Sequence, residues 1–304
     1  MSKLITLLGP TATGKTALAT QLAYSLDGEI ISADSRQVYR EMNIGTGKDL
    51  DEYIVNGQAI PYHLIDIHDC GYEYNVFEYQ DDFHKAFTDI TARQKTPILC
   101  GGTGLYIEAV LKGYKMIPVP PNDELRAELE QKEHEELVAI LSTKQKMHNT
   151  TDTSSKKRTI RALEIALYCE ENEIEETVYP KMNTTVIGIH RERDVIKQKI
   201  TTRLKARLEE GMIEEVQALL NKGIPLDKLK FYGLEYKFIA QYLSSEINYN
   251  DMYQRLNTAI HQFAKRQMTW FRKMEKDGTK INWIDGELSM PQKLKAVEEL
   301  LAKS

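Results

Sequence analysis

The chain has 304 residues, of which 41% are hydrophobic and 28% are charged, a composition typical of a globular protein with a sizeable core. The formal net charge of −5 argues against indiscriminate binding to nucleic acid, although it leaves room for local basic patches. No apolar run reaches the ~18 residues of a membrane span, and neither a signal-peptide pattern nor a C-x-x-C pair occurs, so we expect a reduced, cytoplasmic protein without a disulfide framework or a zinc site.

A glycine-rich loop lies between a predicted strand at residues 4–8 and a predicted helix at 17–23. It fits the pattern G-x-x-x-x-G-K-[ST] in the strand and helix context that a P-loop requires. Its backbone N–H groups can surround a phosphate at the positive end of the helix, Lys15 can add a charge, and the Thr16 hydroxyl can hold Mg²⁺. The alternative is a glycine turn with a surface lysine. We therefore predict a diphosphate or triphosphate site at Gly9, Pro10, Thr11, Ala12, Thr13, Gly14, Lys15 and Thr16.

The second predicted strand, at residues 29–32, runs into a polar turn that contains Asp34. In an open parallel sheet the carboxyl ends of the strands line the ligand crevice, so we expect Asp34 to face the phosphate loop across a cleft. A carboxylate there can take a proton from an attacking amine or hydroxyl. An N-cap for a following helix is the alternative, and it is compatible with the first role.

Two later segments contain residues that are typical of ligand sites, but their sequence context argues against ligand binding. Gly-Thr-Gly-Lys at 45–48 has no strand before it and no clear helix after it, so we expect a turn rather than a second phosphate loop. Residues 62–69 alternate polar and apolar side chains like a strand, but His63, Asp66 and His68 would not share one strand face. This spacing argues against a metal site.

A helix predicted at 76–93 precedes a third strand at 96–100, which ends in Gly-Gly-Thr-Gly before a helix at 105–111. At such a strand end a P-loop ATPase or GTPase would usually carry an Asp that holds the metal. The glycines and Thr103 disfavour both of these readings. They favour a substrate that approaches the backbone closely.

The composition changes after the proline-rich segment at 118–121. Residues 122–136 form an acidic helical pattern, 149–155 form a polar loop, and 156–167 form a basic helix. A strand at 186–189 then returns to the sheet.

These elements predict an α/β fold with a P-loop NTPase-like core, in which helices flank a mainly parallel sheet. We assign residues 1–112 and 185–304 to this core and residues 113–184 to an inserted helical lobe. The remainder of the chain after the strand at 186–189 is predicted to be helical.

Two of these last helices carry clustered cations. The helix at 200–220 places Arg203 and Arg207 one turn apart. The span 256–273 contains four basic residues and no acidic one, with a predicted core stripe at Ile260, Ala264, Met268 and Phe271. Its charge favours contact with a polyanion such as RNA, and an ordinary solvated face is the alternative.

Three functions fit these residues. The first is transfer of a group from a phosphorylated donor to a nucleic acid, the second is a nucleotide-dependent RNA-binding switch, and the third is a small-molecule kinase. Asp34 favours the transferase over the switch, because a switch needs no base. A small-molecule kinase would leave the basic patches unused.

Several distinctive segments are spread over nearly the whole chain: GPTATGKT at 9–16, SADSRQVY at 32–39, IGT at 44–46, HLID at 63–66, GGTGLY at 101–106, RALE at 161–164 and AKRQMTWFR at 264–272. In these segments the chain resembles the bacterial tRNA dimethylallyltransferases, also called tRNA isopentenyltransferases.

The resemblance implies a donor and an acceptor. The donor is dimethylallyl diphosphate rather than ATP, and Mg²⁺ assists the departing diphosphate. The acceptor is the exocyclic amine of the adenine immediately 3′ of the tRNA anticodon. Asp34 matches the general base, Thr103 lies beside the reacting groups, and Lys15 and Arg203 match residues that hold the diphosphate.

The resemblance also implies a monomer without membrane attachment, whose inserted lobe closes over the anticodon stem-loop. The chain departs from the family pattern at residues 152–155, at Leu234 and at 260–261, all in or near regions expected to face RNA. The positions that match tRNA contacts are Asp34, Ser35, Arg36, Gln37, Thr103, Arg126, Lys157, Arg158, Thr159, Ile160, Arg161, Lys265, Arg266, Gln267, Met268, Thr269, Trp270, Phe271 and Arg272.

Overall fold

The computed structural model describes residues 3–144, 153–172 and 179–303. Most of the predicted polar loop at 149–155 therefore lies outside the described residues. The chain divides into two compact units, one of residues 1–112 and 181–304 and the other of residues 113–180. No helix in the described part of the chain is long and apolar enough to cross a membrane.

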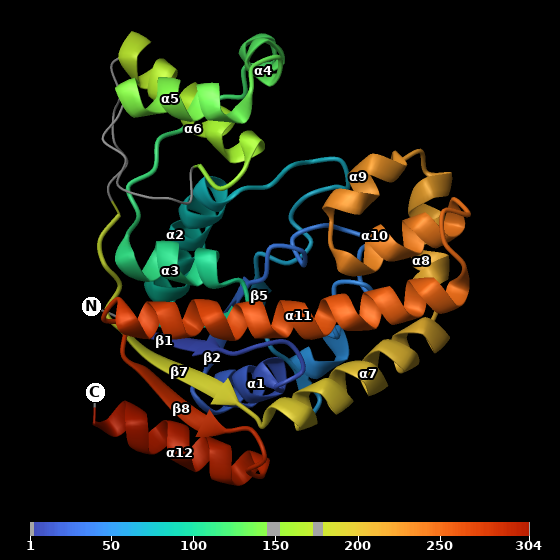
Figure 1. The fold of residues 1–304 in the computed structure, drawn as a ribbon. Helices are drawn as coiled ribbons and strands as arrows, with labels where there is room; N and C mark the ends of the chain where they lie inside the picture. Colours follow the sequence, from blue (N-terminus) through green and yellow to red (C-terminus); the bar gives the residue numbers. More distant parts are fainter. Residues whose placement is uncertain (1–2, 145–152, 173–178, 304) are drawn as a thin grey trace. The chain divides into compact units, whose positions relative to one another are not determined.

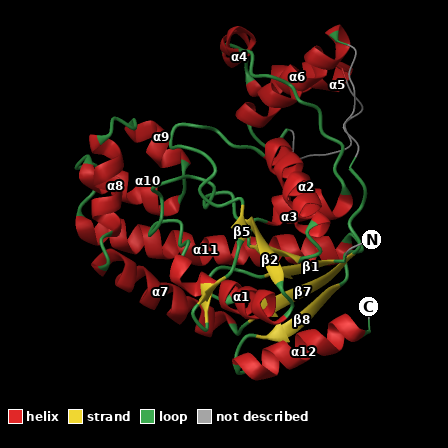
Figure 2. Cartoon of the chain, turned by 180° about the vertical axis from the view of Figure 1, so that it is seen from behind, coloured by secondary structure: helices red, strands yellow, loops and turns green. Residues whose placement is uncertain are grey.

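The larger unit is built on a parallel sheet of six strands in the order β5-β2-β6-β1-β7-β8 (Figure 2). The central strands are buried along almost their whole length, as expected when helices cover both faces of a parallel sheet. Because every strand runs the same way, their carboxyl ends meet at one edge. The strands are β1 (Leu4–Leu8), β2 (Gly28–Ala33), β5 (Tyr62–His63), β6 (Thr96–Gly101), β7 (Thr184–His190) and β8 (Ile281–Asp285), and a separate hairpin pairs β3 (Ile54–Val55) with β4 (Gln58–Ala59).

Alternate side chains of the strands enter two separate cores. Ile5 and Leu7 pack with α1 (Lys15–Ser25) and α12 (Met290–Ala302) on one face. Leu4 and Leu8 belong to the core on the other face, which also contains residues of α2 (Val76–Ala92), α3 (Gly104–Lys112) and α11 (Tyr249–Lys276). This period of two fixes which strand residues face each layer.

A group of helices continues the larger unit beyond the sheet. Helix α11, drawn in orange in Figure 1, packs against α7, α10 and α3. Its buried side chains recur every three or four residues, as in an amphipathic helix. The other helices of the group are α7 (Arg193–Glu209), α8 (Met212–Asn221), α9 (Leu226–Phe231) and α10 (Leu234–Leu243).

The smaller unit contains α4 (Asp123–Glu130), α5 (His134–Lys144) and α6 (Lys156–Glu171). These helices lie where helical patterns were predicted. They enclose a core of their own, in which Leu137, Leu141 and Leu163 are fully buried.

Three sequence-based predictions of secondary structure are wrong. The predicted helix at 200–220 is two helices, because Gly211 adopts a φ of 103° between α7 and α8. The strand predicted at 62–69 ends at His63, because Leu64 and Asp66 have φ values of 62° and 56°. The C-terminal region is not wholly helical, since β8 extends the sheet beside β7.

Candidate active site

A cavity of about 1210 Å³ opens at the carboxyl edge of the sheet within the larger unit. Its floor is formed by the loops that follow β1, β2 and β6, and its walls by faces of α7, α10 and α11. This is where an open parallel sheet binds its ligands. The predicted residues Lys15, Asp34, Thr103 and Arg203 all line it.

The phosphate loop has the local geometry that its sequence predicted. Gly14 has a φ of 85° and caps α1, which leaves the first N–H groups of the helix without partners inside the helix. A Cβ atom at Gly9 would lie 2.7 Å from the carbonyl oxygen of Ile189, so only glycine fits there. The Thr13 hydroxyl donates to the Pro10 carbonyl at 2.8 Å and closes the loop.

Lys15 extends along the inside of this loop. Its Nζ donates to the Pro10 carbonyl oxygen at 2.8 Å. Burial, with a smaller contribution from the neighbouring Arg203, lowers the pKa of Lys15 to about 8, although Cys100 and Asp34 act in the opposite direction. A bound anion would remove this penalty, so the side chain is suited to bind phosphate.

Asp34 and Thr103 are held by hydrogen bonds between two loops. The Thr103 hydroxyl accepts from the Ser35 N–H at 3.1 Å, and the Thr103 N–H donates to the Ala33 carbonyl at 3.1 Å. Asp34 Oδ1 accepts from the Arg36 N–H at 2.9 Å. Since a turn and no helix follows, Asp34 closes a turn and is not the helix N-cap that was considered.

The arginine wall of the cavity comes from α7. Arg203 and Arg207 both pair with the Asp49 carboxylate, Arg207 at 3.1 Å. Burial and the adjacent Arg207 lower the pKa of Arg203. Burial, together with Asp49, raises the pKa of Glu52, which also lines the cavity. The cavity residues Asp49, Glu52 and Glu235 were not predicted from the sequence, because they lie outside the motifs.

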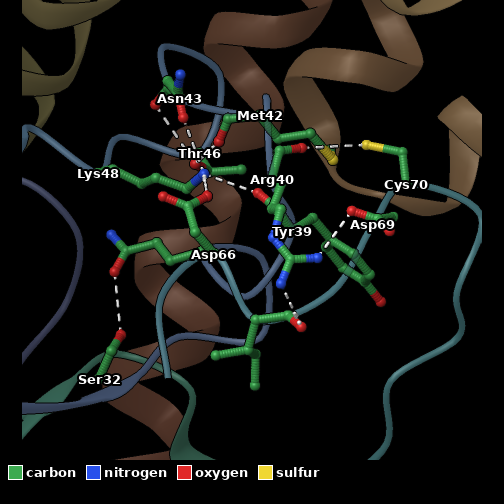
Figure 3. A network of polar contacts seen from close by, with 12 residues as sticks. Ser32, Tyr39, Arg40, Met42, Asn43, Thr46, Lys48, Asp66, Asp69 and Cys70 are labelled. Carbon is green, nitrogen blue, oxygen red and sulfur yellow. Dashed lines mark hydrogen bonds and ion pairs between the residues drawn. The ribbon is translucent and has the colours of Figure 1, made fainter. Parts of the chain in front are cut away.

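A buried network fixes the turn that carries Asp49. Lys48 is 1% exposed, and its Nζ donates to the Tyr39 carbonyl at 2.7 Å, to Asn43 Oδ1 at 2.9 Å and to Asp66 (Figure 3). The lysine of Gly-Thr-Gly-Lys therefore holds its own turn together. The prediction of a turn rather than a second phosphate loop is confirmed.

The carboxylate of Glu215 secures the same turn from α8. It accepts from the backbone N–H groups of Asn43, Ile44 and Gly45 at 2.8 to 3.0 Å, and from the Tyr236 hydroxyl at 2.6 Å. The Glu215 carboxylate thus binds to backbone N–H groups whose arrangement suits an anion.

The residues considered for a metal site are engaged in other contacts. His63 Nε2 lies 2.7 Å from Glu29, which also pairs with Arg93. Among the residues that the structure describes, no three His, Cys, Asp or Glu side chains are grouped as metal ligands.

The positions of α11 that were matched to tRNA contacts divide between its two faces. Lys265, Arg266, Thr269 and Arg272 are exposed, and the Arg266 guanidinium lies 5.9 Å from the centre of the Phe263 ring. Phe271 is fully buried, and its side chain packs in the core.

The other matched positions of α11 are buried or partly buried. Gln267 is 8% exposed. It takes the core position that was predicted for Met268, which is only partly buried. Trp270 packs against Gly104, where a Cβ atom would lie 2.4 Å from its ring.

The matched positions of α6 and its neighbour α4 are also mixed. Lys157 and Arg158 are exposed, whereas the side chains of Thr159 and Ile160 are buried. Arg126 and Arg161 pair with Glu164, which is 2% exposed.

The matched positions after β2 are half-buried. The Arg36 guanidinium lies 5.2 Å from the centre of the Phe231 ring. Gln37 uses its amide inside the protein, donating to the Gly47 carbonyl at 3.1 Å and accepting from the Ser32 hydroxyl at 3.0 Å.

Comparison with known proteins agrees with this geometry. The family described as IPP transferase matches residues 37–274, and the family described as isopentenyl transferase matches residues 2–64. The chain is 55% identical to tRNA dimethylallyltransferase 2 of Bacteroides fragilis over 298 residues, which cover 98% of this chain and 97% of that one. The chain belongs to the IPP transferase family.

Other relatives extend the similarity to solved structures. A tRNA dimethylallyltransferase 2 of Porphyromonas gingivalis is 56% identical over 297 residues, 98% of each chain. The crystal structure of a tRNA isopentenylpyrophosphate transferase from Bacillus halodurans has a TM-score of 0.72 at 32% identity and covers 100% of this chain and 96% of that one. A eukaryotic dimethylallyltransferase acting on tRNA has a TM-score of 0.76 at 23% identity, over 94% of this chain and 74% of that one, and supports the fold alone. The predicted P-loop-like α/β fold and the predicted family are confirmed.

Proposed function

We propose that the protein transfers the dimethylallyl group of dimethylallyl diphosphate to the exocyclic amine of the adenine immediately 3′ of the anticodon in tRNA. The observation that carries this proposal is the placement of Asp34 and Thr103 in the cavity that the phosphate loop also lines. Membership of the IPP transferase family supports it. Because tRNA is the acceptor, the reaction would take place in the cytoplasm.

The leaving-group side of the reaction needs positive charge. The bond between the allylic carbon and the diphosphate oxygen breaks, and its electron pair leaves with the diphosphate. Lys15, the first N–H groups of α1 and Arg203 lie where they would stabilise that growing negative charge. The half-buried position of Lys15 strengthens its electrostatic effect.

The acceptor side needs a base. The amine nitrogen forms the new bond to the allylic carbon and gives its proton to the Asp34 carboxylate. Thr103, whose hydroxyl is fixed by the Ser35 N–H, borders the same space. To enter the cavity the adenine must leave its stack, which costs a few kcal/mol. Partly exposed Phe231 and Phe263 at the cavity wall could stack on the extruded base.

Thr16 fits the role of a Mg²⁺ ligand. Its side chain lines the cavity beside Lys15 and, within the described residues, has no hydrogen-bond partner in the protein. Mg²⁺ bound there would neutralise charge on the diphosphate.

The RNA side of the proposal rests on α11 and on the smaller unit. Exposed Lys265, Arg266 and Arg272 would contact phosphates of the anticodon stem-loop. We further propose that the smaller unit, which was predicted as residues 113–184 and comprises residues 113–180, acts as the lobe that embraces tRNA, and that the enzyme works as a monomer.

The proposal is tested by mixing the purified protein with unmodified tRNA and labelled dimethylallyl diphosphate. A parallel reaction contains labelled ATP and a small-molecule acceptor. We expect the label from dimethylallyl diphosphate in tRNA, on the adenine 3′ of the anticodon. Phosphorylation of the small acceptor without label in tRNA would instead identify a kinase.

A further inference from the structure

We propose that Gln267 is a positioning residue that ties the phosphate loop to the loop carrying Thr103, and that it acts through these loops rather than by contact with tRNA. The inference rests on the proposed transferase function. In this role the buried side chain of Gln267 aligns the donor with the acceptor.

The side-chain amide of Gln267 bridges two loops that are distant in sequence. Its Oε1 accepts from the Thr11 N–H at 2.9 Å, and its Nε2 donates to the Gly102 carbonyl at 2.9 Å. With 8% exposure, the side chain is held inside the protein. Thr11 belongs to the phosphate loop and Gly102 directly precedes Thr103. One side chain thus sets the separation of the diphosphate site from the reacting centre.

The chemistry of the bridge requires an amide. It must present an acceptor to an N–H group and a donor to a carbonyl at the same time. Methionine has nearly the same length but would leave both backbone groups without a partner. An ionised glutamate could still accept from Thr11 but would place negative charge against the Gly102 carbonyl.

The bridge depends on the close approach of Gln267 to the backbone at Gly102. A Cβ atom at Gly102 would lie 2.4 Å from Gln267 Nε2, so the glycine allows the amide to reach the loop. Gln267 also interrupts an otherwise apolar buried stripe on α11, between Ala264 and Phe271. Burying a polar side chain in this stripe is costly unless its hydrogen bonds are made.

Gln267 lies next to the outer face of α11 that we assign to tRNA. Arg266 is its exposed neighbour in sequence. A tRNA bound on that face would therefore lie one residue away from a side chain that fixes both loops. Displacing reacting groups by about 1 Å can cost on the order of 10²-fold in rate, so loss of the bridge should slow transfer more than it weakens tRNA binding.

The test compares Gln267→Met and Gln267→Glu with Gln262→Met, an exposed position of the same helix. For Gln267→Met we expect kcat to fall about 30- to 100-fold, the Kd for inorganic pyrophosphate to rise several-fold, and the Kd for tRNA to stay within about twofold. Gln262→Met should match the wild type in all three quantities.

The pH dependence of kcat in Gln267→Glu distinguishes a positioning role from a merely structural one. When protonated, its carboxyl group can again accept from Thr11 and donate to Gly102. The ratio of its kcat to the wild-type kcat should therefore rise as the pH falls. This variant also keeps the test open if Gln267→Met does not fold.

Two results would overturn the inference. One is a Gln267→Met variant with normal kcat and weakened tRNA binding, which would make the residue a tRNA contact. The other is a Gln267→Glu variant whose kcat ratio does not change with pH. If the wild type transfers no label but binds pyrophosphate, the proposed function fails, and the effect of Gln267→Met on pyrophosphate affinity still tests the bridge.

Discussion

Two basic helices, α11 in the larger unit and α6 in the smaller one, use their cations differently. On α11, Lys265 and Arg272 are exposed and, among the described residues, have no acidic partner within ion-pair distance. On α6, Arg161 forms an ion pair with the buried Glu164, which also pairs with Arg126.

A basic run in the sequence therefore does not by itself indicate cations that can bind RNA. Both helices were matched to RNA contacts, but the Glu164 carboxylate holds Arg126 and Arg161 in ion pairs within the smaller unit. Glu164 also accepts from the Asn122 N–H, at 2.6 Å. Lys265 and Arg272 of α11 thus remain available to phosphates, whereas Arg126 and Arg161 of the smaller unit already share a carboxylate.

The largest effect on binding affinity is expected from neutralising the exposed cations of α11. Replacing Lys265 and Arg266 by alanine should weaken tRNA binding about 10- to 100-fold and reduce the salt slope of binding by about 1.5 to 2. The measurement is Kd against salt concentration, with Lys276→Ala, exposed near the end of the same helix, as the control. An Arg161→Ala variant that lowers the slope as much as Arg266→Ala would break the comparison between the helices.

Lys15 is a third kind of cation, half-buried and without a carboxylate bonded to it among the described residues. Its pKa of about 8 means that it loses its charge as the pH rises past that value. Pyrophosphate affinity should then fall by up to about tenfold per pH unit, and binding should take up a proton.

Calorimetry in buffers with different ionisation enthalpies measures both the affinity and the proton uptake. Lys15→Arg keeps its charge throughout this range, so its affinity should not follow the same pH dependence. If both proteins lose affinity in parallel, another group is titrating.

The smallest effect is expected from the internal pair of the smaller unit. Burial raises the pKa of Glu164, but Arg126, the Asn122 N–H and Arg161 outweigh it and hold the pKa below its ordinary value. The stabilisation is therefore present at neutral pH and lost as the pH falls through that lowered pKa.

Glu164→Gln should lower the free energy of unfolding of this unit by about 1 kcal/mol, a modest figure because both arginines are more than a third exposed. Hydrogen exchange in α4 and α6 measures it. Glu170→Gln, which breaks the surface pair with Lys144, should change exchange little. Equal effects of the two variants would mean that Glu164 is no more than a surface charge.

The sequence predicted the parts of the site that are local. The phosphate loop, its helix and the strand ends carrying Asp34 and Thr103 follow from short patterns and from the geometry of parallel sheets. The strand β8 was missed because it is short and follows a long helix. The break at Gly211 was missed because the apolar pattern continues across it.

The remaining features depend on contacts between distant residues. The bond between Gln267 and Thr11 spans 256 residues, and the bonds from Glu215 to the turn at 43–45 span more than 150. No local period encodes such pairings. The one available signal was a polar residue, Gln267, within an apolar stripe. The predicted stripe was displaced by one position at this point and therefore included Met268 instead of Gln267.

Single-turnover transfer to tRNA with Asp34→Asn, measured together with the Kd for tRNA, tests the role of Asp34 most directly. We expect transfer to slow about 10²- to 10⁴-fold, because the proton acceptor is lost, while tRNA affinity stays near the wild-type value. Transfer at a near-normal rate would contradict the role of Asp34 as the base. It would also contradict the claim that this cavity joins a departing diphosphate to an RNA base.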